Sequence, residues 1–234
     1  MLNVSAIVVA AGSSRRMGFD KLLVPISGRS VLLHSLDRFE ACPAVGEIVL
    51  VLHPERRKEI GRIVEAERYT KLHRVVEGGS ERHLSVWAGL QASRLEADLV
   101  AVHDAARPLV RPEAIMHAIH QAGLCGAVAL AAPVVETLKR TGRDNVVTAS
   151  VDRQGLWAMQ TPQIFRRDWL WAGYQTILAR GEVVTDEVSA VQAAGHPVKL
   201  LENLTWNLKI TFPRDLEMAE SLMRLVPGVI GKEG

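Results

Sequence analysis

The chain has 234 residues, of which 48% are hydrophobic and 23% charged, and its formal net charge is +2. This composition supports a sizeable core and excludes extensive disorder, sequence-independent binding to nucleic acid and, because no apolar stretch reaches about 18 residues, a membrane-spanning helix. The two cysteines, Cys42 and Cys125, match neither a disulfide framework nor a zinc-binding pattern, so we expect a reducing cytoplasm. The amino terminus lacks a basic leader, so we expect an unprocessed protein, and the charge balance and short apolar runs predict no nucleic-acid or membrane partner.

Five short runs rich in Val, Ile and Leu predict β-strands, and longer helix-compatible segments separate them. The runs cover residues 4–10, 47–52, 74–77, 99–103 and 127–132. This alternation is typical of βαβ units, and strands that are apolar on both faces belong in a mostly parallel sheet with helices on each side. We therefore predict an α/β fold in a single domain over residues 1–234.

The unusual sequences of the chain follow these strands directly. They are residues 10–18, 78–82 and 103–108. Because parallel strands end at the same edge of a sheet, ligands bind beyond their carboxyl ends, and we expect the three segments to face one crevice.

The segment that follows strand 4–10 is rich in Gly and Ser, and it brings three cations together. Small residues let backbone N–H groups approach phosphate oxygens, while Arg15, Arg16 and Lys21 supply positive charge. The segment therefore predicts a triphosphate site. For Arg15 two interpretations stay open, a ligand contact and a solvated surface charge.

The regular alternation breaks after Pro133. Residues 136–157 contain two short runs around the turn-like sequence 142–145, which predicts a hairpin arm. Because an isolated two-stranded hairpin is marginal in water, the arm is expected to dock on its own body or on a second copy, and we favour a dimer formed by arm exchange.

Helical patterns return after the arm. We predict three helices here: one over residues 167–179, one that Thr185 caps and that ends at Ala194, and one over residues 213–225. Earlier in the chain, residues 55–74 predict a solvated amphipathic helix. We expect three tryptophans to pack around the base of the arm, namely Trp157, Trp169 and Trp171. We assign no catalytic role to Asp186 and Glu187, because adjacent side chains on a helix point in different directions.

Several common catalytic motifs are absent, which narrows the chemistry. The sequence has no G-x-x-x-x-G-K-[ST], G-x-G-x-x-G, G-x-S-x-G or H-E-x-x-H motif. The reaction class that remains is attack of a phosphate oxygen at the α-phosphorus of a nucleotide, with loss of pyrophosphate. Its main difficulty is negative charge, which cations and a metal relieve, and a dianionic phosphate needs no general base.

An ordered set of motifs, spread over nearly the whole chain, resembles that of the 2-C-methyl-D-erythritol 4-phosphate cytidylyltransferases of the non-mevalonate isoprenoid pathway. The motifs lie at residues 10–17, 21, 78–85, 103–108, 132–140, 151–153, 161–163, 185–187 and 207–211. The resemblance implies a three-layer Rossmann-like nucleotidyltransferase fold with a mostly parallel central sheet and a protruding β-hairpin arm at 136–157 for dimerisation. It implies transfer of CMP from CTP to 2-C-methyl-D-erythritol 4-phosphate.

The resemblance also implies the roles of individual residues. Those expected to stabilise the triphosphate and the departing pyrophosphate are Arg16, Lys21 and Lys209. Those expected to contact CTP are Ala10, Ala11, Gly12, Gly79, Ser80, Ser85, Asp104 and Ala105. Those expected to bind the sugar phosphate are Arg107, Thr137, Arg153 and Thr161, with Thr137 and Arg153 reaching the site of the partner subunit in a homodimer.

A divalent cation, Mg²⁺, is implied as the cofactor, with Asp104 as its nearest protein contact and waters filling most of the coordination shell. The chain departs from the family pattern at Ser80, where Asp is frequent, and at Ser14, where a second Gly is common. Two other hypotheses are a ribitol 5-phosphate cytidylyltransferase and a catalytically silent nucleotide-binding protein of the same fold. The joint presence of Arg16, Lys21 and Lys209 argues against the silent protein, and Thr137 with Arg153 favours methylerythritol phosphate.

Overall fold

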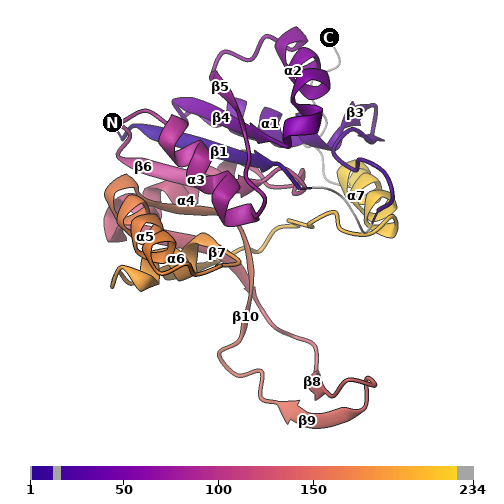
Figure 1. Cartoon of the computed structure of the whole chain (residues 1–234). Coiled ribbons are helices and arrows are strands. Elements are labelled where there is room, and N and C mark those ends of the chain that lie inside the picture. Colours follow the sequence, from indigo (N-terminus) through magenta and orange to yellow (C-terminus); the bar gives the residue numbers. More distant parts are fainter. Residues whose placement is uncertain (1, 13–16, 226–234) are drawn as a thin grey trace.

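Seven strands form one sheet in the computed structural model, which describes residues 2–12 and 17–225 (Figure 1). In spatial order they are β11 (Lys199–Glu202), β7 (Ala127–Pro133), β10 (Trp157–Arg166), β6 (Leu99–Asp104), β1 (Val4–Ala10), β4 (Glu47–Leu52) and β5 (Leu72–Glu77). Strand β10 runs antiparallel to both of its neighbours, whereas the other neighbouring pairs are parallel. The prediction of a mostly parallel sheet is confirmed.

Helices cover both faces of this sheet, because its strands are apolar on both sides. In β1, Ala6 and Val8 contribute to one core cluster, and Ile7 contributes to the other. The helices of the first cluster are α1 (Val31–Glu40), α2 (Arg57–Ala66), α4 (Pro112–Cys125) and α7 (Arg214–Leu225), and those of the second are α3 (Arg82–Ala92), α5 (Arg167–Ala179) and α6 (Glu187–Ala193). The three-layer α/β fold is thus confirmed, and Figure 1 shows α3, α5 and α6 on the same face.

The chain changes direction within the sheet between β1 and β6. From β1 it proceeds to β4 and β5 on one side, and it then returns to add β6 on the other side of β1. Such a switch point leaves a crevice beyond the carboxyl ends of the two strands, because their connections run away from each other. The sheet order therefore selects the ends of β1 and β6 as the place for a ligand.

The sequence did not predict two strands of the large sheet, β10 and β11, nor the short strands at Pro25–Ile26 and Arg29–Ser30. Pro162 lies within β10, and the pairing of β10 with β7 shifts between Met159 and Gln163, so the sequence there lacks the apolar pattern of a strand. Strand β11 has only four residues. Strand β5 begins at Leu72 rather than at residue 74, which leaves α2 shorter than the amphipathic segment 55–74 predicted.

The predicted cap of α6 is wrong. Asp186, and not Thr185, caps this helix, because its carboxylate accepts hydrogen bonds from the backbone N–H of Ser189 at 3.1 Å and from the Ser189 hydroxyl at 2.8 Å. The helix ends at Ala193, one residue before the predicted end. Helix α5 has the predicted bounds, and α7 begins one residue later than predicted.

The predicted hairpin arm is present and extends below the body (Figure 1). Its strands β8 (Leu138–Thr141) and β9 (Val147–Val151) pair with each other in a separate two-stranded sheet, with Leu138 opposite Val151. Most arm residues are exposed. A second two-stranded sheet, β2 (Pro25–Ile26) with β3 (Arg29–Ser30), leads into α1.

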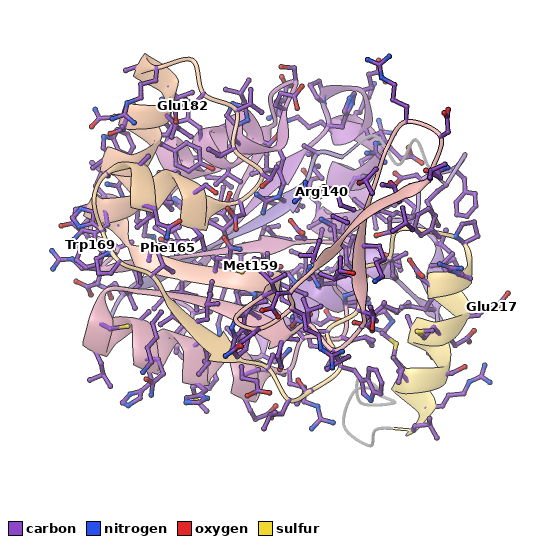
Figure 2. The ribbon with its side chains drawn as sticks, turned by 90° about the horizontal axis from the view of Figure 1, so that it is seen from below. Arg140, Met159, Phe165, Trp169, Glu182 and Glu217 are labelled. Carbon is purple, nitrogen blue, oxygen red and sulfur yellow. The ribbon has the colours of Figure 1, made fainter. Side chains whose placement is uncertain are left out.

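The prediction that three tryptophans pack around the base of the arm is correct only for Trp157. This residue begins β10 opposite Pro133, where the arm leaves the body. Trp169 instead stacks on His196 with ring centroids 4.2 Å apart, and Trp171 packs on Trp87 at 4.6 Å. Both belong to α5, and Figure 2 shows Trp169 on the side of the body away from Arg140 of the arm.

Within residues 2–12 and 17–225, none of the helices combines the length and the apolar character needed to cross a membrane.

Candidate active site

A cavity of about 500 Å³ opens at the carboxyl ends of β1 and β6. This volume is in the range of small-molecule sites. The three segments expected to face one crevice all contribute to its wall, and a fourth segment near the end of the chain completes it. Its lining residues include Ala10, Ala11, Gly12, Lys21, His53, Gly79, Ser80, Glu81, Arg82, Ser85, Asp104, Ala106, Lys209 and Thr211.

The wall formed by residues 78–85 packs closely against the end of β1. A Cβ atom at Gly78 would lie 2.5 Å from the Cβ of Ala11 and 2.6 Å from the Oγ of Ser85, so only glycine fits there. A Cβ at Gly79 would lie 2.5 Å from the Cβ of Leu84. The buried Ser85 hydroxyl donates to the carbonyl of Glu81 at 3.1 Å. Close backbone packing thus fixes the rim of the cavity, and the predicted Gly79, Ser80 and Ser85 all lie on it.

Asp104, at the end of β6, is the centre of a cluster of cations. Its Oδ1 accepts a hydrogen bond from Nε of Arg82 at 3.0 Å, its Oδ2 accepts one from Nζ of Lys209 at 2.7 Å, and Nε of Arg107 lies 3.8 Å from Oδ2. Burial by itself would raise the pKa of Asp104, but the charges of Arg82, Lys209 and Arg107 more than offset burial and hold this pKa well below its usual range. The carboxylate is therefore ionised at neutral pH.

Arg82 connects Asp104 to a second acid that the sequence interpretation left out. Its Nη1 and Nη2 donate to the two carboxylate oxygens of Glu187 at 2.7 and 3.1 Å, and the Tyr174 hydroxyl donates to Glu187 at 3.1 Å. The Glu187 side chain is 0% exposed. Arg82 and Glu187 both lie in motifs named in the sequence analysis, at residues 78–85 and 185–187. Because 105 residues separate the two side chains, the motifs did not indicate that they pair.

His103 and Thr161 hold the backbone beside Asp104. Nε2 of His103 lies 3.1 Å from the carbonyl of Arg107, which can only accept, so Nε2 carries the proton and Nδ1 accepts from the Thr161 hydroxyl at 3.1 Å. The same hydroxyl accepts the N–H of Asp104 at 3.1 Å. Burial lowers the pKa of His103 to about 4, which keeps the imidazole neutral. Thr161, predicted to bind substrate, is 4% exposed and its hydroxyl is engaged with protein groups.

Arg107, predicted to bind the sugar phosphate, braces two neighbouring segments. Its Nη1 donates to the carbonyl of Asn207 at 2.8 Å and its Nη2 to the carbonyl of Met159 at 3.2 Å. Ala105, predicted to contact CTP, is fully buried and its N–H donates to the carbonyl of Val9 at 3.0 Å. Among the described lining residues, Ala106 occupies the wall of the cavity in its place.

The two predicted lysines come together from opposite ends of the chain. Nζ of Lys21 donates to the carbonyl of Ile210 at 2.6 Å, beside Lys209, whose side chain is 39% exposed. Both lysines line the cavity. Arg16, the third predicted cation, and the neighbouring Ser14 and Arg15 lie outside the described residues.

The two predicted residues of the arm do not meet this cavity in the same chain. Thr137 and Arg153 are exposed, and Arg153 donates to the carbonyl of Val135 at the base of the arm. Neither residue is among the described residues that line the cavity.

The switch point of the sheet and the cation-rich cavity beyond it are typical of the class of α/β enzymes that bind phosphate groups. Comparison with known proteins identifies the family within that class. The sequence model of the family IspD, 2-C-methyl-D-erythritol 4-phosphate cytidylyltransferase, matches residues 4–225, and the chain belongs to this family.

Individual relatives agree with this assignment. The chain is 41% identical over 227 residues to the 2-C-methyl-D-erythritol 4-phosphate cytidylyltransferase of Symbiobacterium thermophilum, a match that covers 94% of this chain and 92% of that protein. The structure of 4-diphosphocytidyl-2C-methyl-D-erythritol synthase from Anaerococcus prevotii matches with a TM-score of 0.82 at 29% identity, over 95% of this chain and 96% of that one. The enzyme from Thermus thermophilus matches with a TM-score of 0.77 at 32% identity, over 95% and 100% of the two chains.

These comparisons confirm the resemblance recognised in the sequence. They do not favour the ribitol phosphate enzyme or the silent nucleotide-binding protein.

Proposed function

We propose that this chain transfers the cytidylyl group of CTP to 2-C-methyl-D-erythritol 4-phosphate and releases pyrophosphate. The observation that carries the proposal is the cavity at the ends of β1 and β6, where Arg82 and Lys209 pair with Asp104 and where Lys21 also lines the wall. A phosphate oxygen of the acceptor attacks the α-phosphorus in line, the new P–O bond forms, and the bond from the α-phosphorus to the bridging oxygen breaks. The electron pair of that bond leaves with pyrophosphate.

The main work of the protein in this reaction is the compensation of negative charge. Two anions meet and a third departs, so fixed cations lower the energy of the transition state without any proton transfer. Lys21 would hold the triphosphate and stabilise the leaving pyrophosphate, and Lys209 would join it at the α-phosphate, where it acts mainly on the charge that develops in the reaction. Arg16 is proposed for the same task on the strength of the sequence alone.

The nucleoside would lie against the small residues of the cavity. Ala10, Ala11 and Gly12 leave room for the backbone to approach the ribose and phosphates, and Gly79 with Ser85 would contact the base. Ser80 also lines the cavity, and its short hydroxyl would take the place of the Asp that is frequent in the family.

Mg²⁺ is the proposed cofactor, and the residues present fit a metal that the triphosphate and water mainly coordinate. Within residues 2–12 and 17–225, no group of three His, Cys, Asp or Glu side chains could hold a metal ion. Asp104 is ionised, lies in the cavity and keeps free lone pairs on its oxygens, so it would supply a carboxylate ligand, as is usual for Mg²⁺ bound with a nucleotide. When bound, the ion would neutralise charge on the phosphate oxygens.

We also propose a homodimer in which the arm of each chain reaches the site of its partner. The arm exposes large apolar side chains, with Val135, Val146 and Val147 67%, 66% and 59% exposed, and a two-stranded hairpin needs a surface to pack on. Thr137 and Arg153 of one chain would then bind the sugar phosphate in the site of the other chain.

We propose the reducing cytoplasm as the location, which the free thiols of Cys42 and Cys125 support.

The activity is tested by measuring the release of pyrophosphate from CTP in the presence of Mg²⁺. We expect release with 2-C-methyl-D-erythritol 4-phosphate and none when UTP or ATP replaces CTP. Ribitol 5-phosphate is the control acceptor. Release with ribitol 5-phosphate instead would overturn the proposed acceptor, and the lack of release with either acceptor would overturn the proposed reaction.

Mixing two impaired variants, at a sugar phosphate concentration far below the KM of the Arg153→Ala variant, tests the shared site. A dimer that combines one Lys209→Ala chain with one Arg153→Ala chain has one site with both residues intact if Arg153 serves the partner. After subunit exchange, we expect about a quarter of wild-type activity, because half of the dimers are mixed and each has one working site. No recovery of activity, in a mixture whose subunits have exchanged, would place Arg153 in the site of its own chain.

A further inference from the structure

One side chain, that of Arg56, contacts both Gly12, which follows β1, and Asp20, which precedes Lys21. Its Nη2 donates to the carbonyl oxygen of Gly12, and its Nη1 forms an ion pair with the carboxylate of Asp20. The side chains of Arg56 and Asp20 are each 18% exposed, so solvent screens this contact less than it screens most surface ion pairs. Arg56 thus joins two positions that are eight residues apart in the chain.

Arg56 lies shortly after the end of β4. After Leu52 the chain forms the short 3-10 turn η1 (Pro54–Arg56), and His53 caps it, because Nδ1 of His53 accepts the N–H of Glu55 at 3.3 Å. His53 also lines the cavity. The segment after β4 therefore belongs to the site, although no motif in it indicated a ligand.

The contact with Gly12 affects how the cavity receives an anion. Gly12 lines the cavity, and the partial negative charge of its carbonyl oxygen would repel the oxygens of a triphosphate. The guanidinium of Arg56 compensates this charge and fixes the orientation of the peptide.

The contact with Asp20 affects the neighbouring lysine. The other carboxylate oxygen of Asp20 accepts the N–H of Leu22 at 3.1 Å, so the carboxylate ties Arg56 to the backbone on both sides of Lys21. Lys21 in turn reaches the carbonyl of Ile210. Arg56 therefore stabilises the base from which Lys21 extends.

We propose that Arg56 is a positioning residue for triphosphate binding, which acts by fixing Gly12 and the Asp20–Lys21 backbone in one arrangement. The inference rests on the proposed binding of CTP. A lysine at position 56 would keep the charge, but its single ammonium group cannot bridge two acceptors with the planar geometry of a guanidinium. The geometry of the side chain, rather than its charge alone, is therefore what the site requires.

Calorimetric titration with CTP and Mg²⁺ tests the proposal on wild-type protein, Arg56→Lys and a matched control, Arg57→Gln. Arg57 is the next residue, and it pairs at 3.2 Å with Glu77 while both side chains are more than half exposed. We expect Arg56→Lys to weaken CTP binding by about tenfold, the size expected for a lost charge-assisted hydrogen bond. The control should bind as wild type does, and the KM for the sugar phosphate should change by less than about twofold in either variant.

A double-mutant cycle with Asp20→Asn separates positioning from general damage. If Arg56 and Asp20 act as one unit, the double variant loses no more CTP affinity than the more affected single variant. Additive losses, or a rise in KM for both substrates together with a lower Tm, would overturn the proposal. Equal CTP affinity in wild type and Arg56→Lys would overturn this inference alone, whereas wild-type protein that binds no CTP would overturn the proposed function as well.

Discussion

The buried ion pair between Arg82 and Glu187 makes a quantitative prediction about stability. We consider Glu187→Gln, which keeps the shape of the side chain and removes its charge. The substituted amide can still accept from one nitrogen of Arg82, but its NH₂ group would face the other nitrogen, donor against donor. One hydrogen bond and the charge compensation are lost.

The magnitude follows from burial. Removal of one partner from a buried pair costs about 3–5 kcal/mol, because the other charge stays desolvated. Here Arg82 keeps its contact with Asp104 at 3.0 Å and is 26% exposed, which favours the lower end of that range, about 3 kcal/mol. For a chain of this length, that loss corresponds to a fall in Tm of about 6–12 °C.

Thermal unfolding followed by circular dichroism measures this fall. The matched control is Asp168→Asn, since Asp168 pairs with Arg166 at the same distance, 2.7 Å, but the two side chains are 60% and 53% exposed. Exposed pairs contribute little to stability, so the control should shift Tm by less than about 2 °C. If Glu187→Gln and Asp168→Asn lower Tm equally, the argument that burial rather than distance sets the energy of these pairs is refuted.

Three further predictions concern the reaction and its pH range. Lys209→Ala should lower kcat by about 10²-fold while CTP affinity, measured by calorimetry, changes little, since the ammonium group acts mainly on developing charge. Thr137→Ala and Arg153→Ala should each raise the KM for the sugar phosphate far more than the KM for CTP in steady-state kinetics. Burial lowers the pKa of His34 below its ordinary value of 6.5, so the unfolded chain binds more protons than the folded one as the pH falls below 6.5. The free energy of unfolding, from urea titrations, should therefore decrease below that pH, and His34→Gln should reduce the dependence.

Each of these predictions has an outcome that would contradict it. Unchanged kcat in Lys209→Ala would remove that residue from the mechanism. Equal changes in both KM values would assign Thr137 and Arg153 to the overall structure instead of the acceptor site. A wild-type free energy of unfolding that stays constant from about pH 7 to about pH 5 would mean that the buried imidazoles do not titrate on unfolding.

The order of the sheet could be predicted only in part from the sequence. Apolar runs such as residues 4–10 and 47–52 gave the right strand bounds, because strands covered on both faces have a strong local signal. Strand β10 has no such signal. Pro162 and the shift in pairing near it interrupt the pattern, and its ten residues are ordered by β6 and β7, which come earlier in the chain.

The same limit applies to the site. The turn after β1 and the segments around Gly79 and Asp104 carry unusual local sequences, so their shared place at the sheet edge could be predicted. The pairing of Arg82 with Glu187 could not, because it depends on where α6 packs and because an acid in the first turn of a helix has an ordinary explanation. The functional assignments of Arg107 and Thr161 came from resemblance, and the structure adds their contacts with protein groups.

The lysine contacts have a consequence for the order in which the molecule is completed. The Nζ of Lys21 binds the carbonyl of Ile210, 189 residues later, and Lys209 binds Asp104, 105 residues earlier. During synthesis, every strand of the large sheet leaves the ribosome before this final wall of the cavity does, since β11 ends at Glu202. A translation product that stops after β11 would therefore contain all seven strands of the sheet, but it would lack both the wall that closes the site and α7, which belongs to the first core cluster.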